Sequence, residues 1–252
     1  AEMPAWDPGA GPYVDTIMAI FKKPSCKDPV WSPDTREEMR ARTLAELEKH
    51  DVIGVLSGDS DKDIADWRKA SPERIIPALG DSIRMPVVDA ATVARVKAMK
   101  ASGDLVVLSE IGPQYMGMAP DDPRLEPFWA LAEELDLPVG IHVGTGPPGT
   151  PYLAPPLKDY RARLHSALVI EEVLARHPKL RVYLMHAGYP MIDDLLAVLY
   201  THPQVYVDVG VIVYTQPRPA FYRYLQAIVE AGFAKRVMFG SDNMVWPETI
   251  GR

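Results

Sequence analysis

The sequence predicts an α/β fold with parallel strands, and three observations support that prediction. Short apolar runs alternate with stretches of helical periodicity in seven successive units along the 252 residues. The runs are continuously apolar, a pattern typical of strands that are buried on both faces. Polar side chains able to take part in chemistry follow several of these runs. Units of this kind place their strands in parallel, because each helix returns the chain to the same end of the sheet.

The expected elements follow from the apolar runs and from the capping and turn residues between them. We expect strands over residues 52–56, 74–79, 105–111, 138–143, 180–185, 205–213 and 237–240. We expect helices over residues 33–50, 61–69, 87–101, 121–136, 160–176, 191–200 and 219–231. Residues 1–32, rich in Pro, Gly and Asp, are expected to be a loop-rich segment with a short helix near 14–21.

Individual residues mark where several helices begin and end. Ser32 is the expected cap of the first helix, and Asp122 with Pro123 opens the clearest one. The segments ARHPKLRVYLMHAG and YTHPQVYVDVG share one order, in which a helix end is followed by His-Pro and then by a strand. Proline stops a helix and histidine suits its negative C-terminal end, so we expect His177 and His202 to be caps.

Both an open doubly wound sheet and a closed eight-stranded barrel explain buried parallel strands. Two features favour the barrel. The units continue without a break in composition that would separate two halves. The candidate chemical residues stand at the C-terminal ends of several separate strands, where the active sites of barrels are built. We therefore expect one (β/α)8 barrel domain over residues 1–252.

The bulk composition excludes some classes of function. Hydrophobic residues make up 47% and charged residues 24%, as in ordinary globular proteins, and the formal net charge is −7 with a pI near 5.4. A nucleic-acid binder needs a basic face, so the negative net charge argues against nucleic acid as a partner class and none is expected. No apolar run approaches the roughly 20 residues of a membrane span, so no membrane partner is expected. The single cysteine, Cys26, fits a reducing compartment. We expect a cytoplasmic location, with export open if a leader has been removed.

Four strand ends carry residues suited to a metal site: Glu110, His142, His186 and Asp242. Divalent metals take imidazole nitrogen and carboxylate oxygen as ligands. A catalytic metal site keeps one position for a water molecule, and binding to the metal lowers the pKa of that water to near 7. The four residues are one, one and two strand–helix steps apart. Neighbouring strands lie only about 4.8 Å apart, so the four side chains can converge.

Each residue also has a structural explanation when it is taken alone. A histidine or glutamate at a strand end is usually a hydrogen-bonded rim residue, and Ser-Asp after a strand is often a helix cap. The coincidence of four such strand ends favours a shared site. His165 lies near Arg161 and Arg163, and we expect it on a solvated helix face rather than against an anionic substrate. The segment GTGPPGTP lacks the N–H donors of a phosphate loop and is expected to shape the rim of the site.

Three segments together carry a family resemblance: PVGIHVG, LMHAGYP and RVMFGSDNMVWP. They resemble the fifth-, sixth- and eighth-strand signatures of the amidohydrolase superfamily. More narrowly, the chain resembles the amidohydrolase-related group that includes aminocarboxymuconate-semialdehyde decarboxylase. The resemblance covers about residues 105–247 and implies a (β/α)8 barrel that holds a divalent metal, usually Zn²⁺.

The resemblance also implies roles for the four residues. His142 would be a metal ligand, and His186 a ligand of a second metal or a catalytic residue that contacts substrate. Asp242 would bind metal and take the proton of the attacking water. Glu110 matches a fourth-strand carboxylate that bridges or binds metal in some branches of the superfamily.

One departure from the family pattern bears on the site. The first strand of the superfamily carries a His-x-His pair of metal ligands, and this sequence contains no His-x-His; its first histidine, His50, ends a helix. We expect the first strand to precede Ala1 and the last helix to follow Arg252. The alternative is a diverged protein with a weaker site or none.

The resulting expectation is a metal-dependent hydrolase that cleaves an amide, ester or lactone bond of a small molecule with a metal-activated water. The resemblance equally permits a non-oxidative decarboxylase of an unsaturated or aromatic acid. A non-catalytic barrel that binds a small molecule or a partner is the third alternative. A homodimer is compatible with this type of barrel.

Overall fold

The structure is a computed structural model that describes residues 27, 29, 31–58, 60–79, 88–146, 149–153, 157–242 and 246–251. The helix expected near 14–21, Cys26 and most of the loop-rich N-terminal segment lie outside the described residues. In the described part of the chain, no helix combines the length and the apolar character needed to cross a membrane.

Seven parallel strands in the described residues form the inner layer, and their spatial order is their order in the sequence. β1 pairs with β2, and β3 to β7 form one sheet in which each strand pairs with the next. A bridge between Ala78 and Val107 continues the parallel order from the end of β2 to β3. The strands are β1 (Gly54–Leu56), β2 (Ile75–Pro77), β3 (Leu108–Ile111), β4 (Val139–His142), β5 (Val182–Met185), β6 (Val205–Asp208) and β7 (Val237–Met238).

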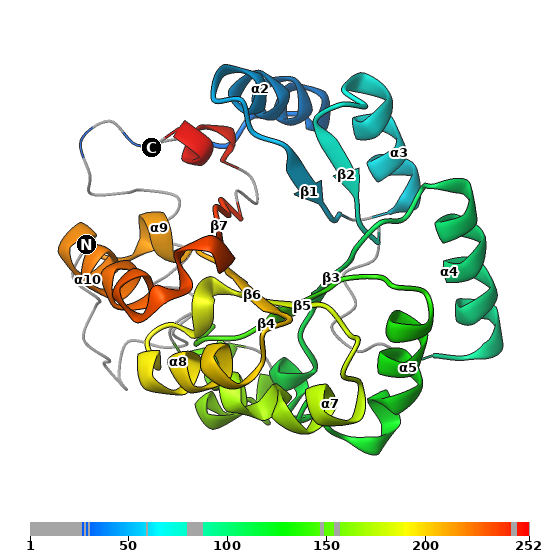
Figure 1. Cartoon of the computed structure of the whole chain (residues 1–252). Helices are drawn as coiled ribbons and strands as arrows, with labels where there is room; N and C mark the ends of the chain where they lie inside the picture. Colours follow the sequence, from blue (N-terminus) through cyan, green and yellow to red (C-terminus); the bar gives the residue numbers. More distant parts are fainter. Residues whose placement is uncertain are drawn as a thin grey trace.

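The helices form the outer layer, as Figure 1 shows in a view along the barrel. Helices connect each described strand to the next parallel strand, as a barrel requires. The longer helices are α2 (Arg36–Lys49), α3 (Asp61–Ala70), α4 (Ala90–Ser102), α5 (Glu126–Glu134), α7 (Glu171–Arg176), α8 (Ile192–Thr201) and α10 (Arg218–Ile228). The short helical turns are η1 (Pro113–Met116), η2 (Pro123–Leu125), α6 (Thr150–Leu153), η4 (Ala162–His165), η5 (Ala167–Ile170), η6 (His186–Gly188), α9 (Ile212–Thr215), η7 (Val229–Phe233), η8 (Ala234–Arg236) and η9 (Pro247–Gly251).

The expected strand–helix alternation is confirmed, but some elements are broken where a continuous one was expected. The helix expected over 160–176 is instead η4, η5 and α7. Ser166 interrupts it, because its backbone is extended and its hydroxyl oxygen accepts a hydrogen bond from the Leu168 N–H at 3.1 Å. The Ser166 hydroxyl also donates to Asp194 at 2.6 Å, which fixes this break against α8.

Two further boundaries differ from expectation for local reasons. The strand expected over 205–213 ends at Asp208, because Val211 has a positive φ of 63° and the chain turns there into α9. The first helix is capped by Thr35 rather than by Ser32, since the Thr35 side chain accepts the Glu38 N–H. His177 and His202 are the C-caps of α7 and α8, as expected.

The main core lies between the strands and the outer helices from α4 to α10. Its largest fully buried side chains include Trp129 of α5, Ile141 of β4 and Leu184 of β5. A smaller cluster of Leu47, Trp67, Ile75 and Ile250 joins α2, α3 and β2 to η9 near the C-terminus. η9 is therefore packed on the N-terminal part of the barrel.

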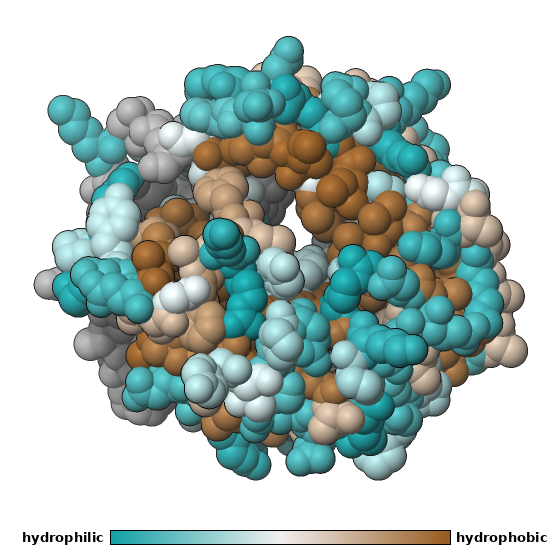
Figure 2. Space-filling view, viewed as in Figure 1, coloured by the Kyte–Doolittle hydropathy of each residue, from teal (hydrophilic) through white to brown (hydrophobic). Residues whose placement is uncertain are grey.

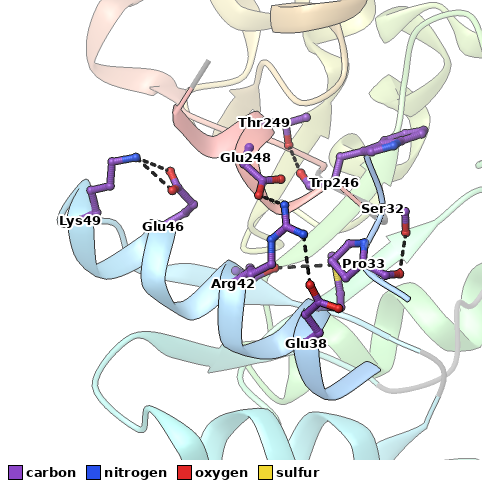
Figure 3. Close-up of polar contacts among 11 residues, drawn as sticks. Ser32, Pro33, Glu38, Arg42, Glu46, Lys49, Trp246, Glu248 and Thr249 are labelled. Atoms are coloured by element: carbon purple, nitrogen blue, oxygen red, sulfur yellow. Dashed lines mark hydrogen bonds and ion pairs between the residues drawn. The ribbon is translucent and has the colours of Figure 1, made fainter. Parts of the chain in front are cut away.

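Polar contacts reinforce the packing of η9 on α2. Figure 3 shows the Arg42 guanidinium between Glu38 of its own helix and Glu248 of η9, with an ion pair to each. These contacts join η9 to α2, which lies beside it.

The barrel is open between β1 and β7, which pair with no further strand among the described residues. Val55 of β1 is 46% exposed and Phe239, just after β7, is 51% exposed. Figure 2 shows apolar side chains along the upper and right-hand edges of a central hollow in this view. A cavity of about 1030 Å³ is lined by β1 and β7 as well as by Glu110 and Asp242. It therefore combines the mouth of the candidate site with the gap between the two strands.

Candidate metal centre

Three of the four expected residues come together at the C-terminal ends of neighbouring strands. Glu110 lies in β3, His142 is the last residue of β4, and His186 follows β5 directly. One ligand atom from each lies within 4.8 Å of the others. Glu110 Oε1 lies 4.0 Å from His186 Nε2. The three strands are consecutive in the sheet, which explains the convergence.

Asp242 lies outside this three-residue cluster but borders the same cavity as Glu110. It follows β7 with a positive φ of 42°, and its backbone carbonyl accepts the Tyr214 hydroxyl at 2.9 Å. Burial raises the pKa of Asp242, the proximity of His186 partly offsets that rise, and the Asp208 carboxylate adds to it. The structure thus places Asp242 within electrostatic reach of His186, two strands further along the sheet.

His142 is held by the turn that follows β3. The Tyr115 hydroxyl of η1 forms a hydrogen bond with His142 Nε2 at 2.8 Å, and the two rings meet edge to face. The Gln114 side-chain N–H donates to the His142 backbone carbonyl at 2.9 Å. Because Tyr115 engages Nε2, Nδ1 is the nitrogen through which His142 would bind a metal without breaking this contact.

His186 is fixed through its other ring nitrogen. A carbonyl oxygen only accepts hydrogen bonds, so the 2.9 Å contact between His186 Nδ1 and the Gly210 carbonyl places the proton on Nδ1. Nε2 then carries a lone pair on the side where Glu110 lies. The histidine is thus prepared to act as a ligand through Nε2.

His165 is not on a solvated helix face, and that expectation is wrong. Its side chain is 0% exposed, and its ring packs against His142 with centroids 5.3 Å apart and against Tyr160 at 4.4 Å. Burial lowers the pKa of His165 to about 4, so the ring is neutral at pH 7. The break at Ser166 explains the error, because it removes His165 from the amphipathic pattern of a continuous helix.

The donor set of the cluster fits a divalent cation. One carboxylate and two imidazoles are the usual mixture for zinc and for other borderline divalent ions. His142 and His186 are only 4% and 5% exposed, and each has a hydrogen-bonded partner that orients its ring. Oriented imidazoles of this kind are typical of metal ligands, whose other nitrogen is engaged by the protein.

Sequence reasoning missed three residues that shape the site: Gln114, Tyr115 and Asp208. Gln114 and Tyr115 lie in a turn whose residues show no periodic pattern, so no sequence signal singled them out. Asp208 had one available signal, because it is a lone carboxylate within the apolar run VYVDVG. A buried carboxylate at the end of a barrel strand needs hydrogen-bond donors, which places it near other functional groups.

Comparison with known proteins supports the fold and identifies the family. The family model described as "Amidohydrolase" matches residues 19–252. Among curated proteins, no sequence matches the chain significantly.

Solved structures with the same fold include three that cover most of this chain. An uncharacterised TIM-barrel protein from Bordetella bronchiseptica has a TM-score of 0.62 and 21% identity, over 86% of this chain and 74% of its own. A probable 2-pyrone-4,6-dicarboxylic acid hydrolase from Acinetobacter baumannii, with citric acid bound, has a TM-score of 0.57 and 16% identity, over 86% and 77%.

The third is a dihydroxybenzoic acid decarboxylase from Polaromonas sp. JS666 with bound manganese and the inhibitor 2-nitroresorcinol. It has a TM-score of 0.56 and 14% identity, and the match covers 87% of this chain and 82% of its own. These similarities show the (β/α)8 fold. The match of the family model over most of the chain shows more, and the protein belongs to the amidohydrolase family.

Proposed function

We propose that this protein is a metal-dependent hydrolase that cleaves an amide, ester or lactone bond of a small molecule. The convergence of Glu110, His142 and His186 beside Asp242 is the observation that carries the proposal. The three clustered groups come from separate strands and meet at the C-terminal end of the barrel, where catalysis takes place in this fold, and Asp242 borders the cavity beside them.

The four residues have different proposed roles. Glu110, His142 and His186 would hold a divalent cation, which supplies Lewis acidity and lowers the pKa of a water molecule when it is bound. Asp242 accepts a proton from the attacking water, since its carboxylate borders the cavity beside the cluster. Because both histidines are buried, their side chains have little freedom to move.

Zinc is the proposed ion, because two imidazoles and a carboxylate suit it well. The same donor set also accepts manganese, and the Polaromonas decarboxylase contains manganese. Both ions should therefore be compared in every assay.

The second candidate is a non-oxidative decarboxylase, and the apolar cavity wall favours it. Val107, Met185, Met238 and Phe239 line the cavity beside Glu110 and Asp242. Such a wall suits an unsaturated or aromatic ring. In this reaction the bond between the ring carbon and the carboxyl carbon breaks, CO₂ leaves, and a protonated Asp242 delivers its proton to the ring carbon.

Isotope labelling separates the two reactions. The full chain, loaded with Zn²⁺ or Mn²⁺, is incubated with a panel of lactones, esters and amides and with a panel of hydroxybenzoic and unsaturated acids. Incorporation of ¹⁸O from labelled water into a product acid supports hydrolysis. Release of CO₂ with deuterium from D₂O on the product carbon supports decarboxylation and contradicts hydrolysis. Metal-dependent binding without turnover of either panel would favour the non-catalytic barrel.

The variant Asp242→Asn tests the role of the carboxylate. The amide keeps the size of the side chain but cannot take up the proton, so we expect turnover to fall by roughly 10²–10⁴-fold, the usual contribution of general acid–base catalysis. Far-UV circular dichroism should be unchanged, and Asp193→Asn, on the exposed face of α8, is the control. Undiminished turnover in Asp242→Asn would contradict the proposed mechanism.

A further inference from the structure

Asp208 is a buried carboxylate to which the proposed mechanism gives no role. It is the last residue of β6 and is 7% exposed. Its Oδ1 atom accepts two backbone hydrogen bonds, from the His186 N–H at 3.2 Å and from the Gly210 N–H at 2.8 Å. Asp208 Oδ1 therefore links the segment that follows β5, at His186, to the segment that follows β6, at Gly210.

The loop that follows β6 also holds the imidazole of His186. The Gly210 carbonyl accepts the hydrogen bond from His186 Nδ1 at 2.9 Å. Asp208 thus fixes His186 twice, directly through the His186 backbone N–H and indirectly through Gly210, whose N–H it accepts and whose carbonyl binds the ring. The three hydrogen bonds close a ring that contains only Asp208, His186 and Gly210.

The backbone around His186 needs such support. His186 and Ala187 have positive φ angles of 61° and 49°, and Gly188 follows with 66°. Residues that carry a Cβ atom disfavour this left-handed region, so surrounding contacts must hold them there. The hydrogen bond from the His186 N–H to Asp208 is formed at the first residue of this turn.

Close packing fixes the carboxylate in its place. A Cβ atom added to Gly210 or to Gly240 would lie 3.0 Å from Asp208 Oδ1. Asp208 therefore fills the space that these two glycines leave between the ends of β6 and β7. A side chain packed in this way has little freedom to reorient.

We propose that Asp208 is the positioning residue of His186: it sets the backbone and the ring orientation of this ligand and acts as a hydrogen-bond acceptor rather than as a metal ligand. The inference deepens the proposed function, on which it rests for the assignment of His186 to the metal. The role of the buried Asp208 carboxylate is then to orient His186.

Two substitutions at Asp208 distinguish its role as a hydrogen-bond acceptor from a role of its negative charge. Asp208→Ala removes the acceptor, and we expect the affinity for Zn²⁺ to fall by about 10–100-fold, the usual effect of losing an outer-shell partner. Asp208→Asn keeps an acceptor oxygen in the same place and should retain most of the affinity. Affinity is measured on the full chain by competition with a chelator, and Asp193→Ala is the surface control.

A second readout follows the tautomer of His186 in the metal-free protein. In long-range ¹H–¹⁵N spectra at a pH above the titration of histidine, wild type and Asp208→Asn should show the proton of His186 on Nδ1. Asp208→Ala should show a mixture of the two tautomers, because the Gly210 carbonyl is no longer fixed. This measurement needs no bound metal, so it still tests the positioning role if the proposed metal site fails.

The outcomes are distinguishable. Equal losses of affinity in Asp208→Ala and Asp208→Asn would show that the charge is essential and would overturn the positioning role. Unchanged affinity and an unchanged tautomer in Asp208→Ala would also overturn it. If the alanine variant does not fold, retained affinity and a retained Nδ1–H tautomer in Asp208→Asn support the proposal, and their loss contradicts it.

Discussion

At the scale of single residues, each of the two candidate histidine ligands is held by a specific neighbour. Tyr115 contacts His142, and Gly210 contacts His186, each through the ring nitrogen opposite to the one that would bind metal. The sequence predicted these positions as candidate ligands because histidine and glutamate stand out at the ends of apolar strands. It could not predict Tyr115, since its contact with His142 depends on how the η1 turn folds back over β4.

The hydrogen bond between Tyr115 and His142 leads to a testable expectation. In Tyr115→Phe the His142 ring loses its orienting partner, so we expect the affinity for Zn²⁺ to fall by about 10-fold or more. Chelator competition measures the change, and Tyr152→Phe serves as a control because Tyr152 is 73% exposed. Equal affinity in wild type and Tyr115→Phe would show that the hydroxyl does not orient His142.

The buried His165 predicts a pH dependence of stability. Its pKa is about 4 in the folded protein, against the ordinary value of 6.5 in the unfolded chain. Below pH 6.5 the unfolded chain therefore binds a proton that the folded protein excludes, and stability falls as the pH decreases toward 4. The full loss corresponds to about 3 kcal/mol in the free energy of unfolding.

Replacing His165 by Gln removes the titrating group and should remove this component. Urea unfolding at pH 7, 5.5 and 4 is compared for the wild type and the variant. We expect the wild type to lose more unfolding free energy than His165→Gln over this range. Parallel pH profiles of the two proteins would contradict the assigned burial of a neutral histidine.

At the scale of elements, the alternation of strands and helices was predictable, whereas the interruptions were not. The apolar runs of β4 and β5 are long enough to identify, and proline and histidine mark the ends of α7 and α8. Ser166 breaks the helix expected over 160–176 where its side chain caps η5, and its contact with Asp194 of α8 holds the break in place. Such a contact joins elements far apart in the sequence, so local periodicity contains no sign of it.

The two helix-capping histidines differ in what they contact, although the sequence presents them alike. His177 is buried between Glu126 and Glu133 of α5, with ring nitrogens 2.9 and 3.0 Å from their oxygens. His202 Nε2 lies 3.4 Å from one carboxylate oxygen, that of Glu171. His177 therefore ties α7 to α5, beyond its role as a cap.

We expect His177→Ala to lower the free energy of unfolding by about 2 kcal/mol, because it removes two hydrogen bonds to charged groups. His202→Ala is the matched control at the equivalent position, and its loss should be clearly smaller. Urea unfolding monitored by circular dichroism gives both values. Equal losses in the two variants would mean that capping alone accounts for the effect of His177.

At the scale of the whole molecule, the sequence predicted the parallel α/β barrel, and the structure adds how its two ends meet. η9 packs on α2 through Arg42 and Glu248, while β1 and β7 leave an opening between them. Seven predicted strands agreed with the seven described, in the expected order. The packing of η9 was not predictable, because Ile250 and Glu248 lie in a short segment without periodicity and contact residues some two hundred positions earlier.

The convergence of the site is itself a property of the whole molecule. Glu110, His142 and His186 are far apart in the sequence, and only the consecutive order of β3, β4 and β5 brings them within 4.8 Å. Asp242 joins from β7, two strands beyond β5, which explains why it borders the cavity outside the cluster. The proposed function therefore depends most on whether this cluster binds a metal.

The most direct test is the metal content of the purified full chain after zinc loading and desalting, measured by mass spectrometry. We expect about one tightly held ion per chain, as for a catalytic zinc site with three protein ligands, and loss of that ion in His142→Ala and in His186→Ala. His202→Ala, in which a distant histidine is removed, should keep the ion. No stoichiometric metal in the wild type, or equal metal content in all four proteins, would contradict the assignment of Glu110, His142 and His186 as a metal centre.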